Sequence, residues 1–377
     1  MSKKKTTAWR IVFLCFLILP TILWFAIGGQ DEKAQTHENR EETTLAAPTL
    51  ATLEEYPMEV EDYYDDHLPF RSKLISLNSL LSYKLLGEAS TSDVIVGKEG
   101  WLFYNKHDDG NPMLGYKGLN VYSQEHLSAI SSQLEATRKY LEENDCEFVL
   151  LIVPDKERMY AEYMSDDYGE PSYYGRADLL VDYLRKNTFV RVVYAKESLD
   201  EFKQVNPDMP LYYHYDTHWN QLGAYVGTCA LLKELGVDAA PIGDLEVEQI
   251  ENSEYDLADL MNLRDYLTDD VDYRLRGYGS GNIEVVEDDD NAVRRFHTTG
   301  QDERKIMVVR DSFGNEMAPY LSAYFNDVVM PHRNTCFNDY TQLTIMENEQ
   351  PDILVYEITE RYLDDLVTFL MPQYTQH

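Results

Sequence analysis

Short, strongly apolar runs alternate with longer amphipathic segments along most of this chain. Residues 148–153 (FVLLIV) are continuously apolar and stop at Pro154, a pattern typical of a buried strand in a parallel sheet. Further short runs predict four more strands, at 190–194, 305–309, 328–330 and 353–356. The pattern therefore predicts a sheet that is covered by other elements on both faces.

The segments between these runs have helical spacing. Ser123 can cap a helix whose apolar residues recur every three or four positions, at Leu127, Ile130 and Leu134. Asn220 can cap a second helix, which ends before Gly236. The other predicted helices are 172–187, 313–325 and 360–371. Alternating strands and helices indicate an α/β fold with three layers, in which helices cover a mainly parallel sheet.

A basic start and an apolar run precede this region. Residues 11–27 are uncharged and close to the length that crosses a bilayer, which predicts a transmembrane signal-anchor. The basic residues ahead of the run place residues 1–10 in the cytoplasm as a basic tail. A cleaved signal peptide, with a loose cleavage site at 26–28, is the alternative. The prediction is a single-pass protein of the cell membrane whose remaining chain is extracytoplasmic.

Residues 28–55 are polar and poor in large apolar side chains, so we interpret them as a linker between membrane and folded domain. The folded domain is predicted to span residues 56–371. Within it, residues 242–304 break the alternation of strands and helices and are rich in acidic side chains. We expect this acidic insertion to consist of loops and short strands at the rim of a site.

The formal net charge is −34, and the only strongly basic stretch is the N-terminal one, Lys3, Lys4, Lys5 and Arg10. Nucleic-acid binding depends on neutralising phosphates, so this charge argues against it. It also argues against a strongly anionic polymer as substrate, unless cations gather locally. Outside the apolar run, Cys146, Cys229 and Cys336 form neither a disulfide framework nor a metal signature.

Two short segments far apart in sequence can together perform acyl chemistry. Residues 213–220 (YHYDTHWN) contain Asp216 and His218, and residues 310–315 (RDSFGN) contain Ser312. On an extended backbone the Asp-x-His side chains project to one side. Asp216 can then orient His218, and His218 can take the proton of Ser312. Taken separately, each residue also has a plainer interpretation, Ser312 as a helix cap and His218 as a structural histidine in a polar turn.

A metal site is a competing hypothesis for the first segment. His214, Asp216 and His218 form an H-x-D-x-H pattern, which on one strand face suits zinc or non-haem iron. The sequence offers no further cluster of His or Cys that supplies a fourth ligand. We therefore predict no metal and no cofactor.

The Asp216-Thr217-His218-Trp219 tetrapeptide and the late strand–Asp-Ser-Phe–helix segment resemble the DHHW family and the related AlgX/AlgJ-type proteins of exopolysaccharide O-acetylation. The resemblance extends to residues 97–104 (GKEGWLFY), 153–156 (VPDK) with Tyr160, and 352–361, and so covers residues 57–371. It implies an SGNH-hydrolase-like fold with permuted motif order, in which Asp-x-His precedes the serine.

The same resemblance implies Ser312 as nucleophile, His218 as base and Asp216 as its orienting residue. SGNH proteins commonly have Gly before Asp-Ser, whereas this chain has Arg310, which can assist an oxyanion or crowd the turn. We expect the Ser312 N–H as the first oxyanion donor and Asn315 as the second. Two further predicted substrate contacts are Trp219, by stacking on a sugar ring unless it packs in the core, and Arg361 after the last strand.

We therefore expect an extracytoplasmic O-acetyltransferase that moves an acetyl group, through a Ser312 acyl-enzyme, to hydroxyls of a cell-surface polysaccharide. The resemblance implies a polytopic membrane O-acyltransferase as partner, since acetyl-CoA is absent outside the membrane. A carbohydrate esterase with the same three residues is the alternative. A glycan-binding or assembly protein without catalysis is a third hypothesis.

Overall fold

The structure is a computed structural model. It describes residues 9–10, 13–14, 18, 22, 44–49, 52–66, 71–252, 254–279, 283–289, 292–299, 301–338 and 348–368. Most of the predicted membrane segment 11–27 and of the linker 28–55 lies outside these residues, so both stay predictions. Among the described residues, no helix combines the length and the apolar character that a membrane crossing requires.

The chain divides into two compact units, Met1–Thr91 with Ala258–Tyr266, and Ser92–Leu257 with Leu267–His377. The first unit includes α2 (Tyr56–Asp66), α3 (Arg71–Leu81) and the π-helical turn η1 (Ser82–Leu86). The second unit contains the central sheet and all the residues predicted to perform chemistry.

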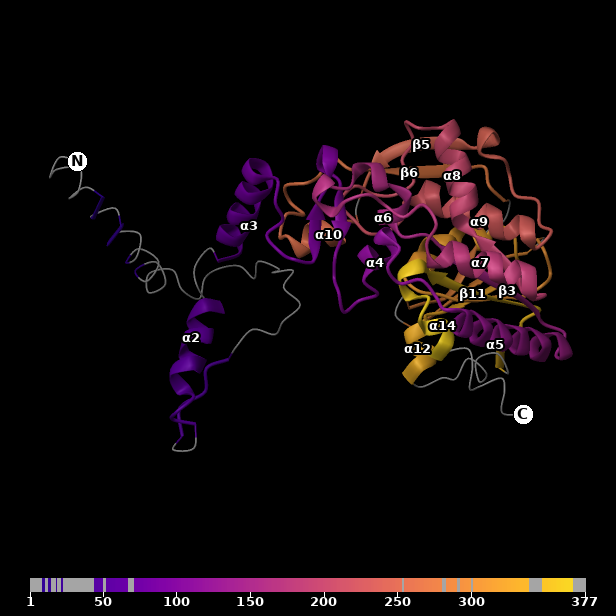
Figure 1. The fold of residues 1–377 in the computed structure, drawn as a ribbon, viewed down its shortest axis with the longest axis horizontal. Coiled ribbons are helices and arrows are strands. Elements are labelled where there is room, and N and C mark those ends of the chain that lie inside the picture. Colours follow the sequence, from indigo (N-terminus) through magenta and orange to yellow (C-terminus); the bar gives the residue numbers. More distant parts are fainter. Residues whose placement is uncertain are drawn as a thin grey trace. The chain divides into compact units, whose positions relative to one another are not determined.

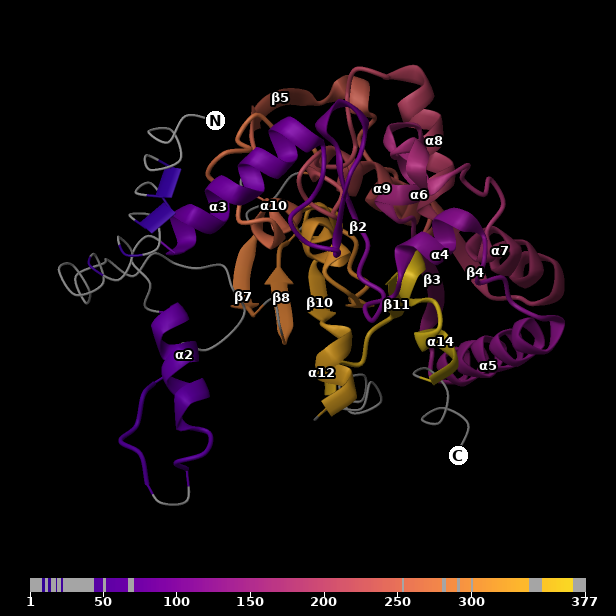
Figure 2. The same ribbon diagram turned by 60° about the vertical axis from the view of Figure 1, so that its left-hand side comes forward.

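The central sheet has the strand order β4-β3-β11-β9-β10-β8-β7. The bounds in that order are Arg191–Tyr194, Glu147–Val153, Ile353–Thr359, Ile306–Val309, Asp327–Pro331, Val293–His297 and Glu284–Asp288. The first five strands are parallel, and β8 and β7 add an antiparallel edge. The prediction of a mainly parallel sheet is confirmed. Residues 242–304 differ from the expectation, because part of this segment extends the central sheet as β7 and β8, which lie beside β10 (Figure 2).

Helices cover both faces of the sheet, since the side chains of each strand alternate between them. Phe148, Leu150 and Ile152 of β3 pack with α5 (Gln124–Glu143) and α7 (Arg176–Asn187). Val149, Leu151 and Val153 pack in a second core with α8 (Ala195–Val205), α9 (Gln221–Glu234) and α11 (Ala318–Ser322). Figure 1 shows α8 and α9 on one side of β3 and β11, and α5 on the other. The second unit is therefore a three-layer α/β structure.

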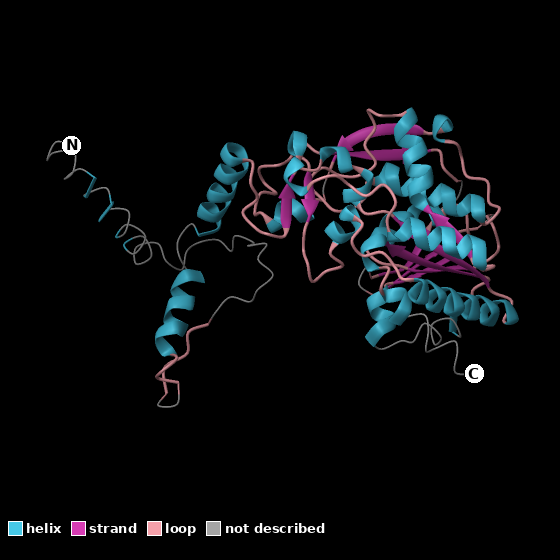
Figure 3. Ribbon diagram, in the orientation of Figure 1, coloured by secondary structure: helices cyan, strands magenta, loops and turns pink. Residues whose placement is uncertain are grey.

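Shorter elements complete the described chain (Figure 3). Two antiparallel pairs are β1 (Val94–Val96) with β2 (Leu102–Tyr104), and β5 (Glu246–Glu251) with β6 (Val271–Arg276). The short α-helices are α4 (Pro112–Lys117), α6 (Lys156–Met159), α10 (Asp256–Leu260), α12 (Arg333–Asn338) and α14 (Asp365–Thr368). The 3-10 turns are η2 (Lys98–Gly100), η3 (Ala161–Tyr163), η4 (Asp166–Tyr168), η5 (Ile242–Asp244), η6 (Phe313–Met317) and η7 (Glu360–Tyr362).

The capped helices are confirmed at their predicted starts. The Ser123 side chain accepts a hydrogen bond from the His126 N–H at 3.2 Å, and the Asn220 side chain accepts one from the Gly223 N–H at 3.0 Å. Gly236 follows the end of α9 with φ +73°, a left-handed conformation that glycine adopts at no steric cost.

Three predicted helices are shorter than expected. The helix predicted at 172–187 begins at Arg176 as α7, and the other two are divided into shorter elements. Residues 313–325 form the 3-10 turn η6 and then α11, which has Pro319 in its first turn, where a missing N–H is tolerated. Residues 360–371 form η7 and α14 in their described part. Here Arg176 donates to the carbonyl oxygens of Glu360 and Arg361, both at 2.9 Å, and so occupies acceptors that a continuing helix uses.

The first turn of α9 packs directly on the segment before it, which gives the first prediction. A Cβ at Gly223 would lie 2.2 Å from the Leu211 carbonyl oxygen. We expect Gly223→Ala to lower the free energy of unfolding by about 1–3 kcal/mol, because a backbone oxygen cannot move aside easily. In the control Gly115→Ala, the new Cβ meets nothing within 4 Å, and helix propensity favours alanine. Urea denaturation checks both variants, and equal stability of the two would contradict the prediction.

Candidate active site

The predicted nucleophile lies on a tight turn between β9 and η6. Asp311 fixes this turn, because its Oδ1 accepts from the Phe313 N–H at 2.9 Å and its Oδ2 accepts from the N–H and the hydroxyl of Thr359 at 2.9 and 2.7 Å. The Asp311 N–H donates to Glu357 Oε2 at 3.0 Å. Asp311 thus caps the turn and joins it to β11, and the Ser312 hydroxyl is left for another partner.

The structure brings the three predicted residues together in hydrogen-bonding order. Ser312 Oγ lies 2.8 Å from His218 Nε2, and His218 Nδ1 lies 2.7 Å from Asp216 Oδ1. A carboxylate can only accept, so Nδ1 carries a proton. In the neutral ring Nε2 is then the acceptor of the Ser312 proton. This is the geometry that a nucleophile, a base and an orienting acid require.

The local backbone differs from the extended strand that the sequence suggested. Residues 214–218 form bends, and the His218 N–H donates to Asp216 Oδ1 at 2.9 Å. The Asp216 side chain thereby folds the chain back on itself, as Asp commonly does in turns. This turn, rather than strand alternation, places the carboxylate against the imidazole.

Asp256 is a fourth residue of the site that the sequence analysis missed. Its N–H donates to Asp216 Oδ2 at 2.7 Å, and its carboxylate accepts from the N–H and hydroxyl of Thr217 at 2.7 and 2.5 Å. Asp256 Oδ2 also lies 3.7 Å from His218 Nδ1. Asp256 belongs to the acidic segment 242–304, where no local pattern distinguishes it from its acidic neighbours.

Charge around His218 determines its proton affinity. Burial opposes protonation of the imidazole, but the charge and hydrogen bond of Asp216 outweigh it and raise the pKa of His218 to about 9. Burial likewise opposes ionisation of Asp216, yet the charge of His218 and three N–H donors hold the pKa of Asp216 below its usual range. Burial and the charge of Asp216 raise the pKa of Asp256 to about 7. His218 is therefore a stronger base than an unperturbed imidazole.

Glu316 is a further acidic group near the imidazole, and the sequence analysis missed it too. Burial raises its pKa to about 7, against an opposing contribution from the charge of His218. The side-chain amide of Gln221 donates to its carboxylate. Glu316 follows Ser312 by four residues, which is the one signal in the sequence that could have indicated it.

The predicted oxyanion residues differ in whether a substrate can reach them. Asn315 is half-buried, and its Oδ1 meets no hydrogen-bond donor among the described residues. The Phe313 N–H is already bound to Asp311, which leaves the Ser312 N–H as the first candidate donor in this turn. Arg310 is 0% exposed beneath the turn, so it does not reach a substrate in this conformation.

Trp219 also differs from the stacking role considered for it. Its side chain is 0% exposed, and its Nε1 donates to the Phe313 carbonyl oxygen at 3.0 Å. A Cβ at Gly227 would lie 2.6 Å from the indole ring, so glycine makes room for it. Trp219 therefore packs in the core and joins the segment of His218 to that of Ser312. Gly223 and Gly227 of α9 both leave room for it, but Trp219 precedes that helix, so helical spacing did not indicate this packing.

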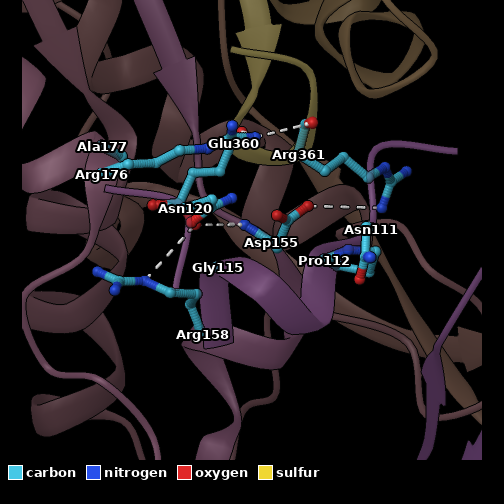
Figure 4. Close-up of a pocket in the computed structure, with 10 residues that line it drawn as sticks. All are labelled: Asn111, Pro112, Gly115, Asn120, Asp155, Arg158, Arg176, Ala177, Glu360 and Arg361. Carbon is cyan, nitrogen blue, oxygen red and sulfur yellow. Dashed lines mark hydrogen bonds and ion pairs between the residues drawn. The ribbon is translucent and has the colours of Figure 1, made fainter. Parts of the chain in front are cut away.

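Arg361 is buried in the wall of the site rather than exposed to a ligand. It lines a cavity of about 10 Å³, the size of one water molecule, with Asp155, Arg158, Arg176 and Glu360 (Figure 4). Its Nη1 lies 3.5 Å from Asp155 Oδ1, and its guanidinium carbon lies 5.4 Å from the Phe313 ring centre. The expected direct substrate contact is not supported by this position.

The structure does not bring His214, Asp216 and His218 together as the H-x-D-x-H hypothesis for a metal site requires. His214 Nδ1 lies 2.9 Å from Asp270 Oδ1 instead of converging with His218. Among the described residues, the His, Cys, Asp and Glu side chains close enough to share an ion are Asp216, His218 and Asp256, with ligand atoms within 4.8 Å of one another. Both nitrogens of His218 are already hydrogen-bonded there, so an ion would have to displace Asp216 or Ser312.

Residues 94–360 match the family described as SGNH hydrolase-like domain, acetyltransferase AlgX. The chain belongs to this family. The resemblance predicted from its motifs is thereby confirmed. A protein named probable alginate O-acetylase AlgJ from Pseudomonas syringae pv. tomato is 23% identical over 339 residues, which cover 85% of this chain and 81% of that protein.

Two solved structures share the fold of this chain. A DHHW family protein from Eubacterium siraeum has a TM-score of 0.53 at 15% identity and covers 72% of this chain and 92% of its own. PatB1 of Bacillus cereus, determined with a sulfonyl adduct, has a TM-score of 0.53 at 13% identity, with coverages of 73% and 99%. At these identities the likeness concerns the fold alone.

The charge of Asp256 gives a prediction on pH dependence. Only neutral His218 accepts the Ser312 proton, so the reaction of Ser312 with phenylmethanesulfonyl fluoride should rise with pH through a midpoint near 9. Asp256→Asn removes a negative charge beside the ring, which makes protonation less favourable. We expect the midpoint to fall by about one pH unit. Intact-protein mass spectrometry across pH measures the rate.

The exposed variant Asp167→Asn serves as the control and should keep the midpoint of the unaltered chain. A midpoint that stays in place in Asp256→Asn, or that rises, would contradict the assigned electrostatic effect.

Proposed function

We propose that this member of the AlgX family is an extracytoplasmic O-acetyltransferase that acts on a cell-surface polysaccharide through a Ser312 acyl-enzyme. The observation that supports the proposal most directly is a chain of two hydrogen bonds, between Asp216 and His218 and between His218 and Ser312, which follows β9. Relatives named probable alginate O-acetylase AlgJ support a polysaccharide as acceptor and acetyl as the transferred group. The Asp-x-His pair precedes the serine in the chain, as the permuted motif order requires.

In the first half-reaction, Ser312 Oγ attacks the carbonyl carbon of the acetyl donor and His218 Nε2 takes its proton. The C–O bond to Ser312 forms, and the bond to the donor's leaving group breaks as that group takes the proton from His218. The Ser312 N–H, with Asn315 as a second candidate, stabilises the oxyanion. Asp216 stays ionised and stabilises the imidazolium that forms.

In the second half-reaction, a sugar hydroxyl gives its proton to His218 Nε2 and attacks the acetyl carbon. The ester bond to Ser312 breaks, and Ser312 takes the proton back from His218. No cofactor takes part in either step. The predicted anchor at 11–27 would hold the domain at the outer face of the membrane, where a polytopic membrane O-acyltransferase supplies the acetyl group.

Replacing Ser312 by alanine tests the nucleophile. We expect Ser312→Ala to abolish the mass increase of one acetyl group on incubation with an activated acetyl ester, and to lower turnover at least about 10³-fold. Ser92→Ala, at an exposed serine, should retain both. An acetylated Ser312→Ala protein would overturn the role of Ser312.

A comparison of acceptors separates the two enzymatic hypotheses. Both share the acyl-enzyme, so the acetyl group is followed after adding a neutral oligosaccharide to the acetylated domain. We expect O-acetylated oligosaccharide to exceed free acetate for a transferase. Free acetate alone would favour the esterase, and unaltered glycan binding with no acetylation of the wild-type chain would favour the non-catalytic hypothesis.

A further inference from the structure

Lys156, the first residue of α6, carries a buried ammonium group beneath the segment of the candidate base. The side chain is 0% exposed. Its Nζ donates to the carbonyl oxygens of Leu102 at 2.6 Å, His214 at 2.9 Å and Asp216 at 2.9 Å. An ammonium has three protons, so these three acceptors use its full donor capacity.

The surroundings compensate the buried charge in part. Burying a charge is costly unless it is paired and hydrogen-bonded, and burial lowers the pKa of Lys156 to about 8. The charges of Asp270, Glu157, Asp216 and Asp256 oppose this lowering, and the rings of Trp101 and Phe103 lie 5.2 and 5.3 Å from the ammonium. The three hydrogen bonds to carbonyl oxygens hold the ammonium in one place.

The segment that Lys156 binds, residues 213–218, lies outside the helices and strands. Residues 214–218 are bends, closed by a hydrogen bond from the Tyr213 N–H to the His218 carbonyl oxygen at 3.3 Å. Two of the three acceptors of Lys156 belong to this segment, on either side of Tyr215. The third, in β2, joins the segment to another element, and the Leu102 N–H also donates to the His214 carbonyl oxygen at 2.9 Å.

We propose that Lys156 is a positioning residue for the reaction of Ser312: its ammonium fixes the backbone of residues 214–216 and thereby aims the Asp216 carboxylate at His218. This inference rests on the proposed function, since it assigns Lys156 to that reaction. Asp216 is held at two points, its carbonyl oxygen by Lys156 and its carboxylate by the N–H groups of His218 and Asp256. Losing the first point frees the carboxylate to rotate away from Nδ1.

Lys156→Met tests the proposal, because methionine has nearly the same length and no charge or proton donor. We expect sulfonylation of Ser312 by phenylmethanesulfonyl fluoride, measured per folded molecule, to slow about 10²-fold, as a misplacement of about 1 Å does. We also expect the proton NMR signal of His218 Nδ1–H, which lies far downfield when its acceptor is a carboxylate, to move upfield or disappear. Loss of stability alone would move neither quantity in the folded molecules.

Lys203→Met is the matched control. Lys203 also donates to a backbone carbonyl, that of Met159 at 2.5 Å, and its Nζ lies 4.1 Å from the centre of the Tyr160 ring. It does not bind the segment 213–218. We expect this variant to keep the sulfonylation rate of the unaltered chain within about 3-fold, since its lost contacts do not reach Asp216.

A second substitution keeps the test decisive. Lys156→Gln is neutral and can still donate to one or two carbonyls, so we expect a folded protein with an intermediate rate. Wild-type rates and an unmoved His218 signal in both variants would overturn the proposal. Failure of both variants to fold would also overturn it, by making Lys156 a residue of the fold alone. Absence of any reaction at Ser312 in the unaltered chain would instead overturn the proposed function.

Discussion

A buried, ionised carboxylate is the constraint on which the candidate site depends. Asp216 is only 2% exposed, and an acid taken out of water ionises only if hydrogen bonds and opposite charge replace its hydration. Asp216 receives three N–H donors, from His218 N, His218 Nδ1 and Asp256 N. Because one of these donors is His218 Nδ1, the carboxylate fixes the imidazole ring. The other ring nitrogen, Nε2, then lies against the Ser312 hydroxyl.

Two rigid supports hold the segments that meet at this carboxylate. On the side of the nucleophile, Asp311 joins the turn after β9 to Thr359 of β11. Ser312 is therefore held in a fixed position relative to the central sheet. On the side of the base, the indole of Trp219 donates to the Phe313 carbonyl oxygen across the core. The two segments are therefore linked by a buried contact as well as by the hydrogen bond between His218 and Ser312.

The acidic composition of the chain also affects the chemistry of this site. Asp216, Asp256 and Glu316 surround one imidazole, and together with burial they couple its protonation to theirs. Cations lie nearby in the described part of the chain, but Arg361 and Arg310 are buried in its walls rather than exposed toward a substrate. Some of the many acidic residues of this chain thus affect the proton affinity of the proposed base, His218.

The sequence by itself determined the parallel strands, the caps at Ser123 and Asn220, and the three residues Asp216, His218 and Ser312, because hydrophobic periodicity, capping and short motifs are local properties. It did not determine Asp256, Lys156 or the burial of Trp219, Arg310 and Arg361. These depend on contacts between residues far apart in the chain, such as Lys156 with the carbonyl oxygen of Asp216. Only the tertiary structure decides which acids and cations share a buried volume, since burial and charge pairing have no signature at a fixed spacing.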